Sequence, residues 1–266
     1  MFDANISIWP FYHTETVEER RKFVINVYLE FLGFLVLGFV HWILMLTLLQ
    51  DWISDLVREH TSALLLAFVV GMFLLLLFAL SKPLRKMTCI NWMVALIIVE
   101  CVVVSLSVLI ITSGMLYMLA GFLIVAVVVV FTTLISALMP YDLTGTGIYL
   151  YMLAYGAYML SLYSLVLYTV LDVFWGFYLF AGLIACVVLI VRIFRFPFSA
   201  TVWCITTTHH LQFLMYHVQC ITGGRRASTA LYDDKLAALL LFHEFLGLFL
   251  LTLYWRPIME RLQLKQ

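Results

Sequence analysis

Long apolar runs, separated by short polar stretches, dominate the pattern of this chain. Each run is close to the ~17–25 residues with which a helix crosses a hydrocarbon core of ~30 Å. Backbone groups in lipid must be satisfied within the protein, and no run shows the alternation of a barrel strand, so each is predicted to be a helix. The eight runs are 23–49, 61–80, 90–112, 115–139, 147–170, 173–191, 197–220 and 236–255.

This pattern predicts an all-α membrane protein, a polytopic bundle of seven or eight transmembrane helices. Residues 1–22 are expected to form a short cytosolic N-terminal segment, and residues 256–266 a short C-terminal tail. Residues 23–255 between them are expected to form a single transmembrane bundle, since no run of linker composition divides them.

The basic residues give the orientation, because Lys and Arg collect on the cytosolic side of membrane proteins. Arg20-Arg21-Lys22 precede the first run, which predicts a cytosolic N-terminus and a lumenal loop at 50–60. Eight spans would place Arg225 and Arg226 on the lumenal side, against this rule. A re-entrant late segment would reduce the count to seven, and both counts stay open.

Composition supports a membrane protein and argues against several other classes. Hydrophobic residues make up 65% of the 266 residues and charged residues 11%, whereas soluble domains have about 45–50% and about 25%. The net charge is zero without a long basic run, so no nucleic-acid partner is expected. The five cysteines lack metal-ligand or redox spacing. No nucleophile–base pair, nucleotide loop or metal triad is evident, so we expect neither an enzyme nor a cofactor.

Two titratable residues near the C-terminal end are the main candidates for function. Glu244 lies at the middle of the last apolar run, where a charge is costly and calls for a partner. His217, near the end of the preceding run, is the expected partner, because a short polar link can set the two helices side by side. The pair would form a pH-dependent latch. Alternatively, His217 hydrogen-bonds a backbone carbonyl at the membrane interface.

Other polar residues within the runs carry weaker predictions. Glu100 interrupts a run of Ile and Val, and we expect this lone carboxylate to face a polar pore interior. Glu30 and His41 are expected near the interface. His209 and His210 share a helical face with His217, but the spacing is not that of a known metal motif, so no metal site is predicted.

A C-terminal signature carries a resemblance to a known family. It comprises Tyr216 and Gln219, then Gly223 with the basic pair Arg225-Arg226, an acidic link, and a helix with Ala238-Leu239 at its core. An earlier loop, in which Asp142 follows Tyr141, matches the same family more weakly. On these residues the chain resembles a divergent member of the transmembrane Bax-inhibitor-motif family, whose branches include the lifeguard and Golgi anti-apoptotic proteins.

The resemblance implies layers of helices around a central C-terminal helix, although the stretch from Asp142 to Tyr216 is longer than usual by about one span. It also implies a pH-sensitive calcium leak across the endoplasmic reticulum or Golgi membrane, with suppression of cell death and calcium as the transported ion. The family's two latch aspartates correspond to His217 and Glu244 here. The alternative is a non-conducting membrane scaffold that binds cell-death regulators or calcium-handling proteins.

Overall fold

The computed structural model describes residues 15–140, 142–146, 211, 214–224 and 228–253. Nearly all of these belong to one compact unit, formed by residues 1–145 together with 214–266. The second unit, 146–213, contains almost none of the described residues. The architecture below is therefore that of the first unit.

Every regular element of the described part is a helix, which confirms the predicted all-α class. A further helical segment at 214–222 precedes the last element. The named elements are α1 (Val17–Thr47), α2 (Gln50–Leu80), α3 (Lys82–Lys86), α4 (Thr88–Ser105), α5 (Ser107–Ser113), α6 (Met115–Leu138), the 3-10 turn η1 (Leu143–Thr146) and α10 (Asp234–Leu253).

The structure corrects the predicted lumenal loop at 50–60. These residues are helical, because α2 begins at Gln50 and continues without a break into the apolar run. Charged side chains do not interrupt a helix, and Asp51 in the first turn is placed favourably for the helix dipole. The connection between α1 and α2 is therefore only a few residues long.

The predicted single helix at 90–112 is divided into α4 and α5 at Leu106. Serine residues flank the break, and each bonds a carbonyl near the end of α4: Ser105 Oγ donates to Val102 O at 2.7 Å and Ser107 Oγ to Val104 O at 2.6 Å. Such local side-chain bonds compete with the helical ladder and bend helices. An apolar run with two serines thus forms two helices instead of one.

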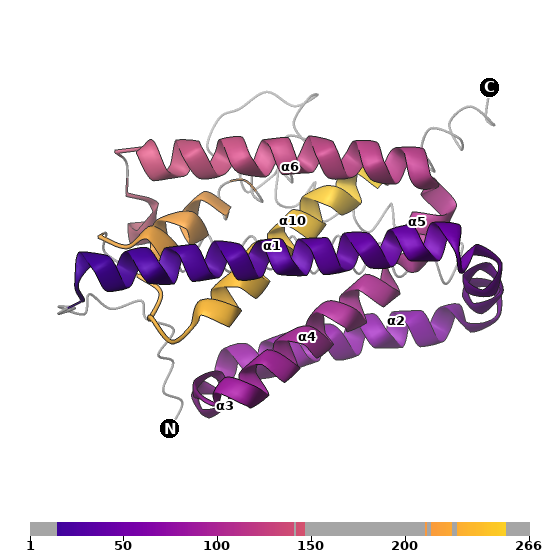
Figure 1. Ribbon diagram of the computed structural model, residues 1–266, viewed down its shortest axis with the longest axis horizontal. Helices are drawn as coiled ribbons and strands as arrows, with labels where there is room; N and C mark the ends of the chain where they lie inside the picture. The colour runs from indigo at the N-terminus through magenta and orange to yellow at the C-terminus, as the bar shows by residue number, and fades with distance from the viewer. Residues whose placement is uncertain (1–14, 141, 147–210, 212–213, 225–227, 254–266) are drawn as a thin grey trace, which may run out of the picture. The chain divides into compact units, whose positions relative to one another are not determined.

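Helix α10 lies at the centre of the described bundle. It packs against α1, α6, α4 and α5, and Figure 1 shows it crossing between the long helices α1 and α6. All side chains from 241 to 250 are buried, so α10 has no solvent-facing stripe. A helix that is apolar all round is suited to this enclosed position.

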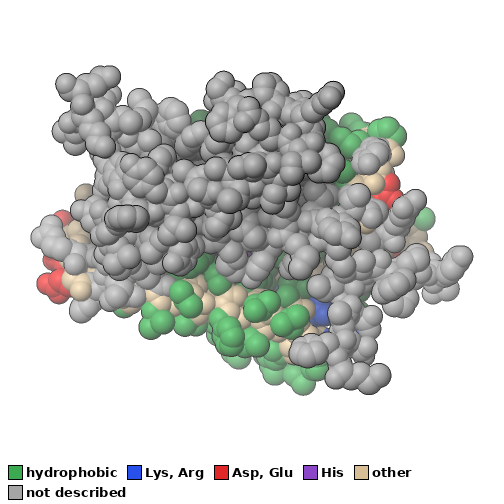
Figure 2. Space-filling model, turned by 180° about the vertical axis from the view of Figure 1, so that it is seen from behind, with side chains coloured by type: hydrophobic (Ala, Val, Ile, Leu, Met, Phe, Trp, Pro, Cys, Tyr) green, Lys and Arg blue, Asp and Glu red, His purple; other side chains and the backbone are tan. Residues whose placement is uncertain are grey.

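The outer faces of the surrounding helices are strongly apolar. Two helices, α1 and α6, are long and apolar enough to cross a membrane by length and composition, and Leu66–Leu80 and Cys89–Ser105 are shorter apolar helices. In Figure 2 hydrophobic side chains cover most of the described surface on the face shown. The exposed residues of α6 include Leu116, Leu123, Ile124, Val127, Val130, Phe131, Leu134 and Leu138.

Candidate functional site

A buried ion pair fixes the turn that leads into the central helix. Arg85, in the short helix α3, lies 2.9 Å from Asp233 through Nη1 and Oδ2, and each side chain is only 7% exposed. Asp233 stands directly before α10 and also closes its first turn, because Ala237 N–H donates to its carbonyl. The pair therefore ties the start of α10 to the polypeptide between α2 and α4.

A second ion pair joins the start of α10 to α1. Lys235 Nζ lies 2.8 Å from Glu30 Oε1 and 2.6 Å from Asp234 Oδ2. The ammonium group also lies 5.0 Å from the centre of the Trp92 ring, on α4. We call the two pairs Arg85–Asp233 and Glu30–Lys235 the α10 clasp, since together they connect the start of the central helix to α1 and α3.

The carboxyl group of Asp233 has a raised pKa in the folded protein. Burial raises the pKa of its carboxyl from 3.8 to about 6, while the nearby cations Arg85, Lys82 and Lys86 act in the opposite direction. Burial disfavours the ionised form, and this cost exceeds the attraction of the cations. The Arg85–Asp233 half of the clasp is therefore expected to weaken as the surroundings become acidic.

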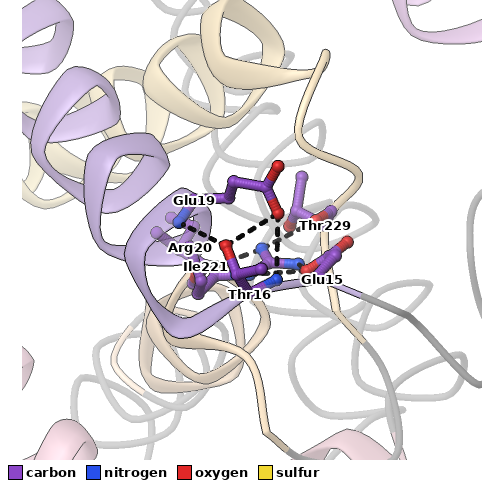
Figure 3. Close-up of polar contacts among 6 residues, drawn as sticks. All are labelled: Glu15, Thr16, Glu19, Arg20, Ile221 and Thr229. Carbon is purple, nitrogen blue, oxygen red and sulfur yellow. Dashed lines mark hydrogen bonds and ion pairs between the residues drawn. The ribbon is translucent and has the colours of Figure 1, made fainter.

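Arg20 closes the end of the helical segment 214–222, as Figure 3 shows. Its guanidinium donates to Ile221 O at 3.4 Å and to Thr229 O at 2.8 Å, and it is paired with Glu15. A cation at the carboxyl end of a helix satisfies carbonyls that lack partners in the helix. Arg20 thus connects α1 to the link before α10.

Gly223, one of the predicted signature residues, is explained by this contact. Its φ of +73° is left-handed, and a Cβ there would lie 3.0 Å from Arg20 Nε. Only glycine combines that backbone conformation with such a close neighbour at low cost. Arg225 and Arg226, the next residues of the signature, lie outside the described residues.

Gln219 and Asp142 both shape the connection that follows α6. Gln219 is fully buried, and its Oε1 accepts a hydrogen bond from Leu143 N–H at 2.9 Å. Asp142 Oδ1 accepts from Thr144 N–H at 2.9 Å and from its hydroxyl at 2.6 Å. These two predicted site residues therefore hold backbone turns in place and join the end of α6 to the 214–222 segment.

The predicted latch residues are both buried inside the bundle, and so is Tyr216. His217 lies in the 214–222 segment and Glu244 at the middle of α10. His243, beside Glu244, is also buried, and its Nδ1 lies 2.7 Å from Leu239 O. A carbonyl only accepts, so Nδ1 carries a proton there. The bundle thus encloses His217, His243 and Glu244, and the His217–Glu244 pair stays a prediction.

Glu100 is not the lone carboxylate that the sequence suggested. Its Oε2 lies 3.5 Å from His41 Nδ1, and the two side chains are 38% and 36% exposed. The packing of α1 against α4 brings them together. His41 was expected near the interface, without this partner. The pair lies on the flank of the helices and not in the enclosed centre that α10 occupies.

The ion pairs of the clasp are the part of the site that the sequence analysis missed. Asp233 entered it only within the acidic link and Glu30 only as an interfacial residue, and Arg85 and Lys235 were not predicted to be site residues. A signal was present, because Arg85, Asp233 and Lys235 all flank apolar runs. No group of three potential metal ligands occurs among the described residues, and His209 and His210 lie outside them.

Comparison with known proteins adds no relative to this description. No family model, no curated protein and no solved structure matches the chain. The functional assignment therefore depends on the geometry of the bundle, with its enclosed α10, the clasp at the start of that helix and the titratable residues along it.

Proposed function

We propose that this protein is an integral membrane bundle that leaks cations, calcium in particular, across an internal membrane such as that of the endoplasmic reticulum or Golgi. The buried residues His217, His243 and Glu244 form its titratable gate. The observation that supports the proposal most is the placement of His243 and Glu244 on α10, the enclosed helix of a bundle with an apolar exterior. Ionisable groups at such positions are rare unless they serve ion or proton pathways.

The apolar exterior supports the membrane part of the proposal. Soluble monomers rarely expose apolar patches larger than a few hundred Å². Here exposed Leu, Ile, Val and Phe side chains continue along α1, α2, α4 and α6. Lipid chains are the natural covering for a surface of this extent and composition.

The clasp also supports a topology in which α1 and α10 start on the same side of the membrane. Glu30–Lys235 and Arg20–Thr229 bring the starts of α1 and α10 to one end of the bundle. The hairpin of α1 and α2, followed by α4–α5 and α6, returns the chain to that end. The basic residues at the starts of α1 and α10 and in α3 then lie at one end of the bundle, which the positive-inside rule assigns to the cytosolic side.

This topology predicts a simple labelling result. In a variant without native cysteines, single cysteines are introduced at Glu18, Ser228 and Asp55 and exposed to a membrane-impermeant maleimide in sealed vesicles. Glu18→Cys and Ser228→Cys should label from the same side and Asp55→Cys from the other. Labelling of Glu18→Cys and Ser228→Cys from opposite sides would contradict the placement of the starts of α1 and α10 on one side.

Calcium flux tests the function itself. Protein reconstituted into vesicles loaded with calcium should release the ion faster than empty vesicles, and Glu244→Gln should change the rate or its response to pH. Glu59→Gln, at the opposite end of the bundle on α2, is the matched control and should behave like the parent. Intact, inserted protein that releases no calcium would exclude the leak and leave the scaffold as the working hypothesis.

A further inference from the structure

Two lysines of α3 point at the same aromatic ring. Lys82 Nζ and Lys86 Nζ lie 6.0 and 5.2 Å from the centre of the Tyr232 ring. The residues are four apart, so they share one face of the helix. Both side chains are exposed, whereas Tyr232 is partly buried beneath them. The two accessible ammonium groups therefore lie over the same Tyr232 ring.

The cations at this end of the bundle, Lys82, Arg85, Lys86 and Lys235, outnumber the described carboxylates Glu30, Asp233 and Asp234. Asp233 is already bound to Arg85, and Asp234 to Lys235. Within the part of the chain that the structure describes, neither Lys82 nor Lys86 has an ion-pair partner. Two unneutralised cations held close together attract an anion with more than one negative charge, or an anion next to a negative surface.

The position of the pair indicates which anion this is. Leu80 and Met87, on either side of α3, are 62% and 51% exposed, and exposed Ile90 and Met93 follow on α4. The ammonium groups therefore stand where the apolar exterior meets the polar end of the bundle. In a membrane this is the depth of the lipid headgroups.

We propose that Lys82 and Lys86, above Tyr232, bind the headgroup of an anionic lipid of the cytosolic leaflet. This inference depends on the proposed insertion of the bundle in a membrane but not on ion conduction. Anionic lipids provide a phosphate next to the apolar surface, and their acyl chains cover the adjacent Leu80 and Met87. The bound lipid would hold α3, and with it Arg85 of the clasp, at the membrane surface.

Thermal unfolding of the purified full-length protein tests this site. The midpoint is compared in micelles containing phosphatidylcholine alone and phosphatidylcholine with phosphatidylserine. Phosphatidylserine should raise the Tm by about 5 °C, since an anionic lipid surface attracts both lysines. The double variant Lys82→Gln/Lys86→Gln should lose most of this shift. The matched double variant Arg21→Gln/Lys22→Gln, which removes two exposed charges from α1, should keep it.

Each remaining outcome has a definite meaning. If both double variants lose the Tm shift equally, the protein is attracted to the anionic surface as a whole, and the proposed site is wrong. The absence of any Tm shift in the parent would also contradict the site. If soluble inorganic phosphate raises the Tm by the same amount, the site binds a free anion and the lipid proposal is wrong. If the glutamine variant does not fold, Lys82→Arg/Lys86→Arg should keep the shift, and its loss would overturn the proposal. A lipid shift that persists in protein without calcium flux would separate this inference from the proposed leak.

Discussion

Replacing Arg85 by alanine is expected to destabilise the folded protein by about 3–5 kcal/mol at neutral to alkaline pH. The change leaves the Asp233 carboxylate, which is only 7% exposed, without the guanidinium that lies 2.9 Å away. A buried charge without its partner cannot recover the hydration that it loses on folding. Equilibrium unfolding in mixed detergent micelles measures the difference. Arg21→Ala, which removes an exposed arginine of α1, should have little effect.

The effect of Arg85→Ala should also depend on pH. The pKa of Asp233 is raised from 3.8 to about 6 in the folded protein. A carboxyl with a raised folded pKa supports folding most below its unfolded pKa, and this contribution is lost as the pH rises through the folded value. Removal of Arg85 raises that pKa further, so the destabilisation should be small in acid and grow toward alkaline pH. The double variant Arg85→Met/Asp233→Leu should be nearly as stable as the parent at all pH values.

A destabilisation by Arg85→Ala no larger than that by Arg21→Ala would contradict the clasp. Equal destabilisation at acidic and alkaline pH would contradict the role of Asp233 as the stranded partner, even if the variant were less stable.

Gly121→Val is expected to separate α6 from α10 and to destabilise the bundle by about 1–3 kcal/mol. A Cβ at Gly121 would clash with Thr252 Oγ1 and lie 3.3 Å from Thr252 Cβ, both on α10. Thr252 Oγ1 is itself bonded to Phe249 O at 2.7 Å, so turning it away costs that hydrogen bond. The two γ-methyl groups of valine would enlarge this clash, so a small movement of Thr252 would not relieve it.

Gly33→Val is the matched control, because nothing lies within 4 Å of a Cβ at Gly33 on α1. Both substitutions put the same residue into an apolar helix, so they share the change in helix propensity. The difference in unfolding free energy between them reports the α6–α10 contact alone. Equal stability of the two variants would show that α10 is not packed against α6 at this glycine.

The apolar runs predicted the long helices well because their signal is local. The runs 115–139 and 236–255 differ by only a few residues from α6 and α10. The 50–60 stretch was misread because charge ends an apolar run but not a helix. The break at Leu106 was missed because two serines are too few to lower the hydrophobicity of the run, although their hydroxyls bend the helix.

Contacts between distant residues could not be predicted with the same success. Arg85 and Asp233 are separated by 148 positions, and neither lies in a motif that marks it as a partner of the other. Glu100 was assigned to a polar interior because the sequence gives the burial of a run but not which side of a helix faces a neighbour; α1 supplies His41 there. The resemblance to the Bax-inhibitor-motif proteins likewise stays a prediction, since the burial of His217 and Glu244 does not identify a family.

The pH profile of calcium release tests most directly whether the buried residues of 214–222 and α10 form the gate. In the parent, a His217–Glu244 pair combines an imidazole with a carboxylate, so the pH dependence of release should differ from that of a pair of carboxylates. The double variant His217→Asp/Glu244→Asp forms an aspartate pair that shares one proton and should open only as the pH rises. Asp233 is unchanged in both proteins and cannot cause the difference. Identical profiles for the two proteins would contradict the gate.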